Sequence, residues 1–192
     1  MTAEKWIPIL EKELGEFMKT APKISVVHKT DHVRRVWKTS KRLCGKLGGD
    51  LETMAAAVFL HDLGRHYGLE IHGEKSAELA ELVLTRLGFP KQKVEDALDA
   101  IRKHDYDTPA SERKSLYSRI LFDADNLDAF GRVGVLRFIQ FYYLKGKTIP
   151  QVLELIEKRW NGMSLKESKE MFRKDYEYTR DYFLELQKEM EA

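Results

Sequence analysis

Two histidine–aspartate pairs are the residues of this chain best suited to metal chemistry. His61-Asp62 follows the apolar run AAAVFL, whereas His104-Asp105 opens the polar segment YDTPASERK. Imidazole suits Fe, Ni or Zn and carboxylate suits Mg or Mn, so such a pair can serve a divalent ion. A carboxylate that ends an apolar stripe must be satisfied internally. We therefore assign metal ligation to His61 and Asp62 rather than to the second pair.

The elements that position these residues are predicted to be helices, because apolar residues recur at three- and four-residue steps and no alternating strand pattern is visible. The helix that starts at Leu51 carries an apolar face that arrives at His61 and Asp62, and Gly64 ends it. A second helix, opened by Pro90, projects its stripe onto the other pair. Further helices are expected over about 3–19, 28–47, 74–87, 112–130, 132–145, 150–159 and 165–190.

Four segments carry a resemblance to a known family. In chain order they read HKTDHVRRVW, AVFLHDLGR, HGEKSAELA and DADNLDAFG. Together they resemble the HD-domain phosphohydrolase superfamily, and within it the small single-domain bacterial and archaeal HD hydrolases. The resemblance implies an all-α fold, a compact HD-domain helical bundle with additional C-terminal helices. We expect one domain over residues 1–192, with a motif core at about 25–140 and helices of about 132–190 packed on it.

The resemblance also implies a ligand set for one divalent ion, Mn, Mg, Fe, Co, Ni or Zn, made of His32, His61, Asp62 and Asp125. Helix phase supports Asp125, because Asp123 lies about 200° around from it. We expect Asp123 to face solvent or to pair with another helix. A bound ion lowers the pKa of its water, and Asp62, in contact with both, is the predicted catalytic residue.

Phosphate recognition needs fixed cations and hydrogen-bond donors around the ion. Arg65 follows the motif directly, while Arg35 could instead pair with an internal carboxylate and Lys75 could be a surface residue. His28 is expected to support His32. A second ion, bound by His72 and His104, is the alternative to their role as donors to phosphate. The predicted substrate-binding residues are Arg35, Arg65, His72, Lys75, His104 and Asp128.

The predicted function is hydrolysis of a phosphoester or phosphoanhydride in a nucleotide-like metabolite by metal-activated water. The residues after His61-Asp62 are Leu-Gly-Arg-His, without the acidic pair of the alarmone hydrolases, which argues against that substrate. One alternative is a non-catalytic or weakly active HD protein that senses a nucleotide or a metal. A di-iron oxygenase on the same scaffold is the other alternative.

The amino-acid composition narrows the classes of partner that the protein could bind. The 192 residues are 43% hydrophobic and 33% charged, and the net charge of +2 gives no field suited to nucleic acid or a membrane as the main partner. Cys44 is the only cysteine, which excludes an internal disulfide. Without a signal-like or membrane-spanning run, we expect a cytoplasmic protein with a small phosphorylated substrate, a nucleotide. An apolar seam along 165–190 indicates internal packing, with a homo-oligomer interface as the alternative.

Overall fold

The computed structural model describes residues 3–20, 30–67, 69 and 71–191, and every regular element within these ranges is a helix. The prediction of an all-α fold is confirmed. The elements in chain order are α1 (Ala3–Thr20), α2 (Thr30–Leu47), α3 (Leu51–Leu60), the 3-10 helix η2 (Leu63–Tyr67), α4 (Gly73–Arg86), α5 (Lys91–Arg102), α6 (Leu116–Leu127), α7 (Gly131–Phe141), the 3-10 helix η3 (Tyr143–Lys145), α8 (Ile149–Asn161) and α9 (Lys166–Glu191).

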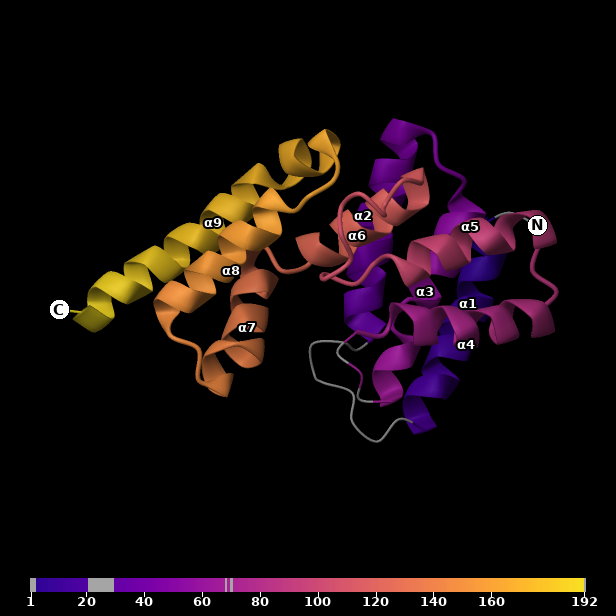
Figure 1. Cartoon of the computed structure of the whole chain (residues 1–192), viewed down its shortest axis with the longest axis horizontal. Helices are drawn as coiled ribbons and strands as arrows, with labels where there is room; N and C mark the ends of the chain where they lie inside the picture. The colour runs from indigo at the N-terminus through magenta and orange to yellow at the C-terminus, as the bar shows by residue number, and fades with distance from the viewer. Residues whose placement is uncertain (1–2, 21–29, 68, 70, 192) are drawn as a thin grey trace.

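Helix α3 is the central helix of the N-terminal part (Figure 1). All of its residues from Glu52 to Leu60 are buried, and α1, α2, α5 and α6 pack around it. The Asp50 side chain begins the helix by accepting a hydrogen bond from the backbone N of Thr53 at 2.9 Å. Because the whole helix is enclosed, the side chains at its C-terminal end also lie inside the protein.

The buried apolar side chains form two clusters. One surrounds α3, and the other lies among α7, α8 and α9, which form one end of the molecule in Figure 1. Helix α6 joins them, since Ala124 belongs to the first cluster and Leu127 to the second. The seam of α9 packs in the second cluster through Tyr176 and Phe183, in line with internal packing. The division into domains stays a prediction.

One sequence expectation changes at this level. The helix expected over 112–130 is shorter, Leu116–Leu127, because Ser115 caps it by accepting a hydrogen bond from the backbone N of Ser118 at 3.1 Å. None of the described helices combines the length and apolar character needed to cross a membrane. A cytoplasmic location stays a prediction.

Candidate metal centre

His61 lies directly after α3 and is fully buried. Its Nδ1 is 2.7 Å from the carbonyl oxygen of Val58, so Nδ1 carries a proton and donates it to that carbonyl. The lone pair is then on Nε2, a buried atom without a hydrogen-bond partner among the described residues. Burial lowers the pKa of His61 to about 4, which keeps the ring neutral. A neutral imidazole with a free, inward lone pair is what a metal ion requires.

The second pair repeats this arrangement. His104 follows α5, and its Nδ1 donates to the carbonyl of Ile101, again three residues back, at 2.6 Å. The centroids of the His61 and His104 rings are 5.0 Å apart. The histidines of the two pairs therefore follow two packed helices with the same Nδ1 contact and face the same centre, although the sequence favoured only the first pair as ligands.

His32, on α2, reaches the centre from the opposite side. Its Nδ1 is 2.7 Å from Oδ2 of Asp128, and its Nε2 is 3.1 Å from Oδ1 of Asp125 and 3.8 Å from Oδ2 of Asp62. Burial opposes protonation, but the hydrogen bonds with Asp125 and Asp128 outweigh it and raise the pKa of His32 to about 9. A metal ion would compete with the proton at Nε2 while Asp128 holds Nδ1 in place.

His72 is fixed by Asp105. The His72 Nδ1 lies 2.9 Å from Oδ1 of Asp105, and its Nε2 lies 2.9 Å from Oδ1 of Asp62. Oδ2 of Asp105 also accepts hydrogen bonds from the backbone N of His72 at 3.0 Å and of Gly73 at 2.6 Å. The start of α4 can lie this close to the end of α5 because Gly73 has no side chain. A Cβ at this position would lie 2.5 Å from the carbonyl oxygen of Arg102. Asp105 therefore sets both the start of α4 and the orientation of His72.

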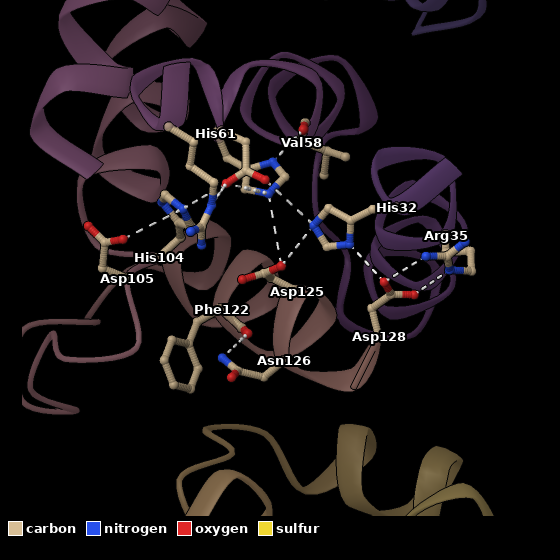
Figure 2. Close-up of polar contacts among 12 residues, drawn as sticks. His32, Arg35, Val58, His61, His104, Asp105, Phe122, Asp125, Asn126 and Asp128 are labelled. Atoms are coloured by element: carbon tan, nitrogen blue, oxygen red, sulfur yellow. Dashed lines mark hydrogen bonds and ion pairs between the residues drawn. The ribbon is translucent and has the colours of Figure 1, made fainter. Parts of the chain in front are cut away.

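The four histidines share one geometry, in which an acceptor holds Nδ1 and Nε2 faces inward. Figure 2 shows the rings of His32, His61 and His104 at this centre. They fall into two groups that share Asp62, and the ligand atoms of each group lie within 4.8 Å of one another. Atoms bound to one ion at about 2.1 Å are roughly 3 to 4 Å apart. The residues fit a divalent ion. The groups are His32, His61 and Asp62, and then Asp62, His72 and His104.

The carboxylates of the centre are ionised, as metal ligands must be. Burial alone would raise the pKa of Asp62, yet the cation of Arg65 and the hydrogen bonds of His104 and His72 hold it well below its usual range. His32 does the same for Asp125. Oδ1 of Asp125 is 3.9 Å from Nε2 of His61, so this carboxylate stands beside the first group. The predicted four-residue set is therefore assembled in one place.

The arginines near the centre are already engaged with acids. Arg65 donates from Nε to Oδ1 of Asp62 at 2.8 Å. Arg35 forms two hydrogen bonds with Asp128, at 2.5 and 3.0 Å, which matches the alternative of pairing with an internal carboxylate. The Nη1 of Arg137 is 3.0 Å from the same acid. Asp128 thus connects His32 to two cations.

Other predicted residues lie elsewhere. The structure does not bring Lys75 to the centre: its ammonium is 2.7 Å from a carboxylate oxygen of Glu78, on the surface. Asp123 is buried rather than solvent-facing, and accepts hydrogen bonds from the backbone N of Ser164 at 2.7 Å and of Leu165 at 2.8 Å. It pairs α6 with the start of α9, the other expected role. His28 lies outside the described residues.

A cavity of about 290 Å³ opens beside the centre. One wall comes from the segments already described, and the other comes from α7, α8 and the residues between them. The sequence did not indicate this second wall, because it lies beyond the recognised segments and has no diagnostic spacing. The lining residues are Arg65, Ile71, Asp105, Tyr106, Asp107, Asp125, Ala129, Arg137, Phe138, Phe141, Tyr142 and Arg159.

Solved structures share this fold. An HD-superfamily hydrolase from Bacillus thuringiensis is 21% identical with a TM-score of 0.75, and all of both chains is covered. A predicted HD superfamily hydrolase from an uncultured Thermotogales bacterium is 23% identical with a TM-score of 0.69, covering 95% of this chain and 92% of its own. Bacillus subtilis YpgQ in complex with ADP is 20% identical with a TM-score of 0.71, and the match covers 98% of this chain and 97% of the YpgQ chain.

At these identities the likeness shows the fold alone. No curated protein matches the chain. The family model described as HD domain matches residues 30–129, which include all four predicted metal ligands and both histidine–aspartate pairs. This match covers more than half of the chain, and it agrees with the hydrolases of the same fold. The chain therefore belongs to the HD-domain superfamily of hydrolases.

Proposed function

We propose that this protein is a metal-dependent phosphohydrolase that cleaves a phosphoester or phosphoanhydride bond in a nucleotide-like substrate. The observation that carries the proposal is the shared orientation of four buried histidines, each with Nε2 directed at ionised Asp62 or Asp125. The adjoining cavity has the mixed cationic and aromatic lining that a phosphorylated ring compound requires. The likeness to YpgQ, crystallised with ADP, is consistent with a nucleotide.

His32, His61, Asp62 and Asp125 would hold the ion, which, when bound, would lower the pKa of a water molecule and neutralise phosphoryl charge. Asp62 is ionised and belongs to both groups, so it can orient that water. Arg65, beside Asp62 and on the cavity wall, is placed to meet a phosphoryl oxygen. We assign these roles to the residues as proposals.

A two-ion form of the same function has a specific observation in its favour. The group of Asp62, His72 and His104 lies next to the first and shares Asp62 with it. In the metal-free protein, hydrogen bonds to Asp105 and Asp62 overcome burial and raise the pKa of His72 to about 9. In this alternative an ion replaces the proton between His72 and Asp62. His104→Ala should then lower the bound metal from two ions to one.

The test is to quantify bound metal and to assay nucleotides and simple phosphoesters with Mn, Mg, Co and Ni. Asp62→Ala should abolish turnover and reduce bound metal, whereas the control Asp96→Ala, an exposed acid on α5, should behave as wild type. Tight nucleotide binding without turnover would establish the sensing alternative. Iron-dependent oxygen consumption would establish the oxygenase.

A further inference from the structure

Arg159, on α8, differs from the other arginines of the cavity in its partners. Its Nη1 donates to Oδ1 of Asn126 at 2.6 Å, its Nη2 donates to the hydroxyl of Tyr142 at 2.9 Å, and its guanidinium lies 4.9 Å from the centroid of Tyr106. All three groups are neutral. No carboxylate of the described residues lies within ion-pair distance of Arg159, whereas Arg65 and Arg137 each have one.

The cation is fixed in place although no carboxylate of the described residues neutralises it. Two hydrogen bonds and an aromatic face hold the guanidinium plane, so little side-chain freedom remains to be lost when a ligand binds. Its remaining N–H groups have no hydrogen-bond partner in the described part of the chain, so they can meet a ligand in the cavity that Arg159 lines. A half-buried, preorganised guanidinium of this kind suits an anion.

The surroundings add positive charge. Arg35 and Arg137 share the single carboxylate of Asp128. Arg137 and Arg159 line the same cavity, so their two positive charges repel each other there. Lys158 lies over the ring of Tyr106 as well, at 5.0 Å. Of the three acids in the lining, Asp105 and Asp125 contact histidines of the metal centre, and Asp107 is exposed. An anion between Arg137 and Arg159 would relieve the repulsion.

We propose that Arg159 and Arg137 form a second anion subsite, so that the substrate carries two phosphate groups, one at the metal centre and one at this subsite. The inference rests on the proposed function and narrows its substrate to diphosphates and higher polyphosphates. A simple phosphomonoester fills only the metal centre. The α7–α9 part of the chain thereby selects the substrate, while α2, α3 and α6 hold the ion.

The test compares the binding of two non-hydrolysable probes, methylenediphosphonate and methylphosphonate, by calorimetry at constant free Mn²⁺. The readout is the ratio of their affinities, which cancels a general weakening of the metal centre. Arg159→Gln should lower this ratio roughly ten- to hundredfold, the range for losing a hydrogen-bonded charge. Arg159→Lys retains the charge but not the fixed guanidinium plane, so it should recover part of the lost ratio. Arg173→Gln, an exposed arginine of α9, should keep the wild-type ratio.

A ratio that falls less than tenfold in Arg159→Gln, or falls equally in Arg173→Gln, would overturn the subsite. Thermal unfolding of each variant shows whether its fold is intact. If Arg159→Gln is misfolded, Arg159→Lys becomes the deciding variant. Complete loss of the ratio in Arg159→Lys, despite the retained charge, would also overturn the proposal. If the wild type hydrolyses monoesters and Arg159→Gln leaves the affinity ratio unchanged, the proposed hydrolase is supported and the subsite is refuted. If Arg159→Gln lowers the ratio but the wild type hydrolyses nothing, the subsite is supported and the proposed hydrolase is refuted.

Discussion

Three acids of one short segment are predicted to respond in three different ways to the same change, aspartate to asparagine. Asp125 faces the metal centre, Asp128 holds Nδ1 of His32, and Asp123 binds the backbone at the start of α9. The substitution keeps the shape of the side chain and removes its charge. The three variants therefore separate ligation, positioning and fold stability within six residues of sequence.

Asp128→Asn is expected to weaken metal binding without removing a ligand. Loss of the carboxylate releases the orientation of His32 and leaves Arg35 and Arg137 without their shared counter-charge near the ion. Partners that hold a ligating histidine contribute about 10- to 100-fold in metal affinity, which corresponds to about 1.4–2.8 kcal/mol. Asp125→Asn should weaken binding further, because it removes a charged ligand.

Asp123→Asn is the matched control. It should leave metal affinity unchanged, but it should lower the free energy of unfolding by about 1–3 kcal/mol, because an amide cannot accept both backbone hydrogen bonds. Calorimetric titration with Mn²⁺, together with urea unfolding of the metal-free proteins, measures both quantities. The reasoning is refuted if Asp128→Asn binds Mn²⁺ as wild type does, or if folded Asp123→Asn weakens binding equally.

Two further predictions concern the fold. Gly73→Ala places a Cβ 2.5 Å from the carbonyl oxygen of Arg102 and should lower the free energy of unfolding by about 1–3 kcal/mol in urea titrations. The control Gly45→Ala has open space around it in α2 and should raise the free energy of unfolding slightly. Equal effects of the two substitutions would contradict the packing argument. Burial raises the pKa of Cys44 to about 12. Since a free thiol ionises near pH 8.5, this residue should stabilise the fold below that pH and lose its contribution as the pH rises towards 12. Ellman's reagent at pH 8 should react only after unfolding, and rapid reaction of the native protein would refute the assignment.

Local physics made much of this protein predictable from its sequence. Helical spacing of apolar residues fixed the all-α class, and helix phase separated Asp125 from Asp123. The apolar stripe of α3 pointed to His61-Asp62. Each histidine of the two pairs also follows its helix in a way that directs Nδ1 to the carbonyl three residues back, a contact within one turn.

Only the tertiary structure decided which residues share the centre. His104 and His72 meet Asp62 because the ends of α3 and α5 and the start of α4 are packed together, and no spacing along the chain encodes that meeting. Arg137 on α7 and Arg159 on α8 line the cavity beside the centre, outside the recognised segments. Short-range periodicity determines where a helix ends and which side is apolar, whereas the approach of distant ends depends on how whole helices pack. That packing joined the two histidine–aspartate pairs in one site.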